Sequence, residues 1–225
     1  MKLFARGVAL LAIAGLMALA MPARAAQTVQ GSLHDMNAVF GAGTIENNEV
    51  CLPCHAPHGM PDRTLTRLWN HNMPVNNYAV YKGATLDETS RKCLSCHDGT
   101  IAVDSYGGNN GGTHKIGGTS ATTGFLVGNN AGDLTHDHPV GVKYDPIYYG
   151  TRFVDPATWN TTTYTTVDGA IHNYTGTVIR TPSLITVGAD KIVSCYTCHH
   201  AHDHSAGFLR MTNDKSQLCL TCHLK

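Results

Sequence analysis

The sequence predicts a mostly irregular chain in which short helices and a few short β-strands alternate with long loops. Glycine is frequent, with 23 among 225 residues, whereas aromatic residues make up only 7%. No long stretch has the 3.6-residue apolar period of a packed helix. The eight cysteines fall into four short motifs, two of which follow helix-start residues. A conventional apolar core built from this composition is thin.

The first 25 residues have the three parts of an export signal. Lys2 and Arg6 make a basic start, residues 7–20 are apolar, and residues 23–25 have the small-x-small form that signal peptidase cleaves. The apolar run is short of the about 20 residues that a membrane span needs. We therefore expect cleavage after residue 25, export through the inner membrane and no stable membrane insertion. An uncleaved anchor is the less favoured alternative.

Cleavage changes the charge of the protein. It removes Lys2, Arg6 and Arg24 and no acidic residue, which leaves 13 basic and 16 acidic residues and a net charge of −3. Nucleic-acid-binding proteins need a concentrated basic surface. We expect no nucleic-acid partner.

Residues 26–225 are expected to form one unit with three parts. Residues 26–100 hold the first two cysteine motifs, 101–190 hold none, and 191–225 hold the last two. The middle part predicts a β-ribbon, because Asp168-Gly169 is a tight-turn dipeptide between 162–167 and 170–174.

Helix-start residues stand before two of the motifs. Asp87-Glu88 leads into the second motif and Asn213-Asp214 into the fourth. Such residues cap helix N-termini. Each motif is therefore predicted to lie on one or two helical turns.

The four motifs share one pattern, Cys-x-x-Cys-His. They are Cys51-Leu-Pro-Cys54-His55, Cys93-Leu-Ser-Cys96-His97, Cys195-Tyr-Thr-Cys198-His199 and Cys219-Leu-Thr-Cys222-His223. Two thiols at this spacing form thioethers with the vinyl groups of a haem, and the histidine binds the iron. Four covalently attached c-type haems are predicted, with the macrocycles as the apolar core.

Two other kinds of site use paired cysteines. Zinc is held by two Cys-x-x-Cys pairs, and exported proteins form disulfides. Neither explains a histidine after the second cysteine in every motif. Haem attachment is the favoured interpretation.

The second axial ligand decides what each iron does. A filled position suits electron transfer, whereas an open one binds substrate. Ten histidines lie outside the motifs: His34, His58, His71, His114, His136, His138, His172, His200, His202 and His204. Histidines outnumber the open positions, so bis-histidine ligation is expected, and Met36, Met60, Met73 and Met211 are the alternative ligands.

Spacing narrows the choice of distal histidines. His58 and His202 each follow a proximal histidine by three residues, which puts both rings on one side of a helical turn. Each must therefore serve a different haem. The nearest haem for His202 is the fourth.

Three further assignments complete the set. His138, held extended by the following proline, is assigned to the second haem, and His34 to the first. The third haem remains for His58. His136 and His204 stay open as replacements for His138 and His202.

Several motifs together resemble a known family. His34-Asp-Met, Cys-x-x-Cys-His-x-Pro-His at 51–58, His138-Pro-Val-Gly and Cys-x-x-Cys-His-x-Ala-His at 195–202 look like those of the extracellular multihaem cytochromes that polymerise into conductive filaments, in particular a tetrahaem member. The resemblance implies haems stacked along a head-to-tail filament of identical subunits. It also implies that His58 ligates the third haem of the adjacent subunit.

Extracellular electron transfer to other redox proteins or to extracellular acceptors is the expected function, and the protein is not expected to be an enzyme. Two alternatives stay open. One is a soluble periplasmic tetrahaem shuttle, which the long haem-free insertion disfavours. The other is a multihaem oxyanion reductase, which needs a haem with an open distal side.

Overall fold

A computed structural model of the chain describes residues 29–57, 68–109, 111–128, 132–145, 152–159, 164–167, 175–178, 182–202 and 206–224. The expected export signal, His58, His172 and His204 lie outside these ranges. The helices within them are α1 (Met36–Phe40), α2 (Glu88–His97), α4 (Cys195–Cys198) and α5 (Gln217–Cys222). Single 3-10 turns span Glu46–Asn48, Thr123–Phe125, Pro156–Thr158, Ala206–Phe208 and Asp214–Ser216. None of the helices in these ranges is long and apolar enough to cross a membrane.

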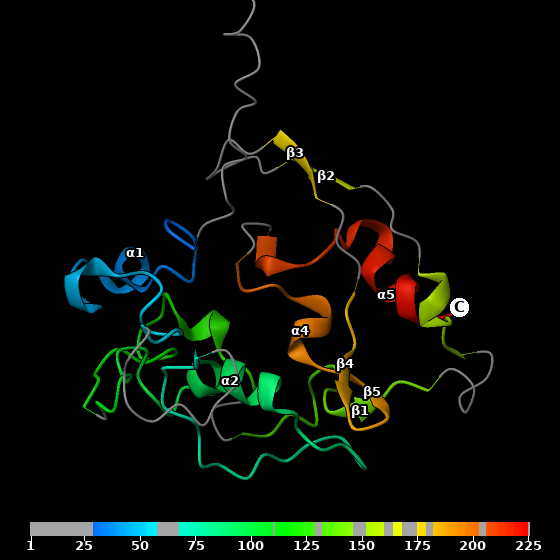
Figure 1. Ribbon diagram of the computed structural model, residues 1–225, viewed down its shortest axis with the longest axis horizontal. Helices are drawn as coiled ribbons and strands as arrows, with labels where there is room; N and C mark the ends of the chain where they lie inside the picture. The colour runs from blue at the N-terminus through cyan, green and yellow to red at the C-terminus, as the bar shows by residue number, and fades with distance from the viewer. Residues whose placement is uncertain are drawn as a thin grey trace, which may run out of the picture.

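The strands form two small antiparallel units that lie far apart in Figure 1. One is a three-stranded sheet of β1 (Val142–Lys143), β5 (Asp190–Val193) and β4 (Ile185–Val187), in the order β1-β5-β4. The other pairs β2 (Tyr164–Val167) with β3 (Thr175–Val178). The small sheet leads directly into α4, and with it into the third motif.

The β2–β3 ribbon differs in register from the expected hairpin. An Asp168-Gly169 turn would place Val167 opposite Ala170, whereas the structure places Val167 opposite Thr175. The second strand therefore lies further along the chain. Its residues Thr175, Thr177 and Val178 are β-branched and favour a strand more strongly than 170–174 do.

The second and third motifs lie on two capped helices that contact each other (Figure 1). Asp87 caps α2 by accepting from the Ser90 backbone N–H at 2.8 Å and from its hydroxyl at 2.6 Å. Ser194 caps α4 through a capping box with Thr197. The Ser90 hydroxyl also accepts from the Cys195 backbone N–H at 3.2 Å. These bonds fix the third motif against the second.

The apolar core is small and lies beside the first two motifs. Met36, Ile45, Val103 and Ile116 form its buried centre, and Leu52 and Cys96 of the motifs pack against it together with Phe40, Tyr106, Phe125 and Leu126. This cluster joins α1 to the segment after α2. The third and fourth motifs lie outside it.

Replacing Asp87 with alanine tests the cap that positions the second motif. D87A leaves the buried Ser90 N–H and hydroxyl without their acceptor, so it should lower the free energy of unfolding by about 1–2 kcal/mol. Denaturant titration of the haem-loaded protein measures this. Asp155 caps an exposed 3-10 turn through the Ala157 N–H, so D155A should cost only about 0.5 kcal/mol. Equal effects would contradict the role given to Asp87.

Candidate functional site

The first, third and fourth motifs share one local structure. In each, the backbone N–H of the histidine donates to the carbonyl of the first cysteine, at 2.8 Å for His55, 3.1 Å for His199 and 2.9 Å for His223. One helical turn thus brings both cysteines and the histidine of a motif to the same side of the turn.

Each of these three histidines then pairs with a second segment in an antiparallel β-bridge. His55 lies opposite Trp69, His199 opposite Leu209 and His223 opposite Phe153. The flanking backbone bonds repeat as well: Asn70, Arg210 and Val154 donate to the carbonyls of Cys54, Cys198 and Cys222 at 3.0, 2.8 and 2.9 Å. The bridge fixes the direction of each imidazole. In the second motif, by contrast, His97 is the last residue of α2.

Backbone carbonyls hold two proximal histidines in one tautomer. His97 Nδ1 lies 2.7 Å from the Phe125 oxygen, and His199 Nδ1 lies 2.8 Å from the Gly207 oxygen. His34 makes the same contact, at 2.9 Å, with the Ala201 oxygen. A carbonyl only accepts, so Nδ1 carries the proton and Nε2 keeps its lone pair for a metal.

Three proximal histidines each make a ring contact with one of the predicted distal histidines, with the ring planes at 73° for His34 and His97, 44° for His55 and His202, and 71° for His138 and His223. The ring centres are 6.2 Å apart for His34 and His97, 6.0 Å for His55 and His202, and 6.2 Å for His138 and His223. A metal bonded to two imidazoles at about 2 Å from each nitrogen holds their centres about 6 Å apart when the rings are in line. The observed separations match this value.

The pairing differs from the one expected from sequence separation. His34 lies opposite His97 rather than His55, His202 opposite His55 rather than His223, and His138 opposite His223 rather than His97. For His34 and His202 the reason is that the residues just after His199 lie against the N-terminal part of the chain: the Ala201 carbonyl is 2.9 Å from His34 Nδ1, and the His202 ring contacts that of His55. Separation along the chain does not show these contacts.

His199 is the remaining proximal histidine. No ring contact like those of His55, His97 and His223 joins it to another described histidine. His58, its expected partner, lies outside the described residues, as does His204. His136 is exposed. His71 is buried, with Nδ1 3.0 Å from the Asn72 oxygen and Nε2 2.9 Å from the Ala102 oxygen, so its nitrogens are already engaged.

Burial favours the neutral, metal-binding form of three of these rings, those of His34, His97 and His223. Burial lowers the pKa of His34 to about 4, with smaller contributions from His97 and His202. Burial also lowers the pKa of His97. Burial, followed by the nearby His138, lowers the pKa of His223.

Several thiols have a raised pKa to which a cysteine of a neighbouring motif contributes. Burial, with a smaller contribution from Cys54 of the first motif, raises the pKa of Cys96 in the second. A hydrogen bond with Cys195 of the third motif raises the pKa of Cys93. Burial, then Cys195 and Cys219, raises the pKa of Cys198. All eight cysteines are described, and all are free thiols.

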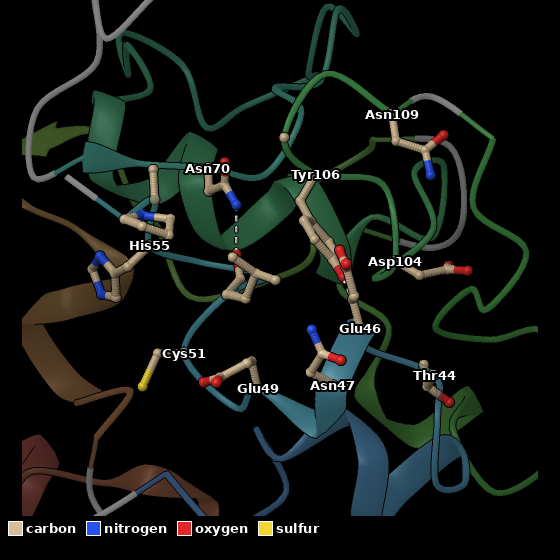
Figure 2. A pocket seen from close by; sticks show the side chains of 14 residues that line it. Thr44, Glu46, Asn47, Glu49, Cys51, His55, Asn70, Asp104, Tyr106 and Asn109 are labelled. Carbon is tan, nitrogen blue, oxygen red and sulfur yellow. Dashed lines mark hydrogen bonds between the residues drawn. The ribbon is translucent and has the colours of Figure 1, made fainter. Parts of the chain in front are cut away.

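A pocket of about 860 Å³ opens beside the first motif. Cys51 and His55 lie at one end and Asp104 and Asn109 at the other (Figure 2). Pockets that hold cofactors are commonly about 300–1,000 Å³ in volume. The pocket, the thiol pairs and the imidazole spacing therefore fit a haem.

The described residues contain no group of three or more His, Cys, Asp or Glu side chains arranged to hold a metal ion. A haem iron takes only its axial ligands from the protein. The chain matches no protein-family model and no curated protein.

Sequence reasoning missed the groups that orient the imidazoles. The carbonyls of Phe125, Ala201 and Gly207 carry no signal, because every residue has one. Phe208 stacks on the His34 ring, with centres 4.2 Å apart and planes at 17°. Its position next to a loop glycine gave no indication of this contact.

Replacing His34 with alanine tests the pairing seen here. In a protein that carries the four haems predicted from the motifs, H34A should turn one haem from low-spin to high-spin, because one axial position opens. Electron paramagnetic resonance detects the change, and NMR links the affected haem to its remaining axial histidine. We expect His97; His55 would contradict the structural pairing. H136A, which changes an exposed histidine, should leave all four haems low-spin.

Proposed function

We propose that the chain is a tetrahaem c-type cytochrome that carries electrons and does not act as an enzyme. The observation that supports this most is the combination of two features. The four Cys-x-x-Cys-His motifs come from the sequence, and imidazole pairs with centres 6.0–6.2 Å apart occur at three of them. Haem iron supplies one-electron exchange between its ferric and ferrous states.

The axial histidines decide the type of chemistry. His34, His202 and His138 lie near His97, His55 and His223, so these pairs would hold both axial positions of three haem irons. A substrate would then find no open position at these sites. Two imidazoles also favour a lower reduction potential than a histidine and a methionine.

The contact between α2 and α4, which carry the second and third motifs, supports a continuous path for electrons. The helices of the second and third motifs also share the bond between Cys195 N–H and the Ser90 hydroxyl. We propose that the four haems are used in chain order.

We further propose that the protein polymerises head to tail outside the cell, after export and removal of residues 1–25. His199 supports this, because its ring is oriented by the Gly207 carbonyl while no described histidine faces it. In the proposed filament, His58 of the adjacent subunit fills that position. When such a head-to-tail contact between identical subunits repeats without closing into a ring, it builds an open filament.

Replacing His58 with alanine tests the polymer. H58A should abolish filaments in electron micrographs of the secreted material while all four haems stay covalently attached. One haem should become high-spin, because the iron bound by His199 loses its distal ligand. H136A is the matched control and should form normal filaments. Normal filaments from H58A would refute ligation across the interface, and monomers from both would favour a soluble shuttle.

A further inference from the structure

Arg210 holds a buried positive charge beside the third motif. Its side chain is 9% exposed. Nε donates to the Tyr196 carbonyl at 2.7 Å, and the guanidinium lies 3.8 Å from the centre of the Tyr196 ring. Nη2 is buried and has no hydrogen-bond partner among the described residues. Part of the guanidinium is thus left without a role in the fold.

The first motif shows what this position needs structurally. Asn70 occupies the same place in the β-bridge as Arg210: its backbone N–H donates to Cys54, as that of Arg210 does to Cys198. The Asn70 side chain donates to the Leu52 carbonyl at 2.6 Å, as Arg210 does to Tyr196. Leu52 and Tyr196 are each the residue after the first cysteine. A neutral amide therefore suffices to cap this carbonyl.

The charge of Arg210 needs another explanation. A buried guanidinium is stable only when an anion or a set of acceptors compensates it. The ion pairs among the described residues join Lys92 to Glu88, His114 to Asp104, and Lys143 to Asp145 and Asp190. None of them includes Arg210.

We propose that Arg210 binds a haem propionate through Nη2. A propionate is a carboxylate, the group that the planar guanidinium fork matches best. The haem is that of the third motif or an immediate neighbour, since the Arg210 backbone N–H donates to the Cys198 carbonyl at 2.8 Å. Arg210 is a positioning residue, because it holds the macrocycle and does not touch the iron. The proposal rests on the haem attachment proposed above.

Replacing Arg210 with asparagine reproduces the first motif and removes only the charge. The protein is loaded with haem carrying ¹³C in its propionate carboxyls, and infrared spectra are compared between oxidised and reduced states. We expect one labelled carboxylate band of the wild type to shift in R210N. NMR then identifies the haem. If the labelled bands are identical in both proteins, any partner is a carboxylate of the chain and the proposal fails.

Reduction by electrode provides a second measurement. A propionate without its cationic partner favours the ferric state. R210N should therefore lower the ratio of reduced to oxidised haem about tenfold at one of the four haems, as expected for the loss of a charged hydrogen bond. R152N removes an exposed arginine near the fourth motif and should leave the ratio unchanged. Equal ratios in wild type and R210N would overturn the proposal.

Two outcomes separate this inference from the proposed function. If R210N fails to fold, R210K keeps the charge but loses the second guanidinium nitrogen, and a smaller shift of the same band is expected. No shift in R210K would also count against the proposal. A wild-type protein without four haems would refute the proposed function itself, whereas four haems with unaltered propionate bands would refute only the role of Arg210.

Discussion

Pairs of imidazoles held about 6 Å apart are the constraint around which this chain is organised. His55 and His202, with centres 6.0 Å apart, join the first motif to the segment after the third. His138 and His223, at 6.2 Å, join the haem-free middle part to the last motif. Each pair connects segments that are distant in the sequence. In the proposed holoprotein, the iron between the rings converts these contacts into cross-links of the fold.

The small apolar core explains why such cross-links matter. The buried cluster of Met36, Ile45, Val103 and Ile116 supports only the first two motifs. At the third and fourth motifs the described structure consists of the short helices α4 and α5, β-bridges, loops and the small sheet β1-β5-β4. Regular structure of this extent buries little apolar surface, so most of its stability has to come from another source. Covalently attached macrocycles would supply that surface.

The sequence indicates local structure here better than it indicates long-range pairing. Asp87 before the second motif predicts the capped helix α2, because capping depends on residues three positions apart. The ring that each distal histidine contacts could not be predicted, because it depends on how segments far apart in the sequence lie against each other, as His34 does against Ala201. The same limit applies to the β2–β3 register. Arg210 had no sequence signal, since its unpartnered Nη2 is visible only in three dimensions.

Haem content tests the central claim most directly. Intact-mass spectrometry of the secreted protein, combined with its paramagnetic resonance spectrum, measures both the number of haems and the spin state of each iron. The account predicts a polypeptide that begins after residue 25, carries four haems in thioether linkage and contains only low-spin iron when polymerised. A secreted protein with fewer than four haems, or with zinc or disulfides at its cysteines, would contradict it.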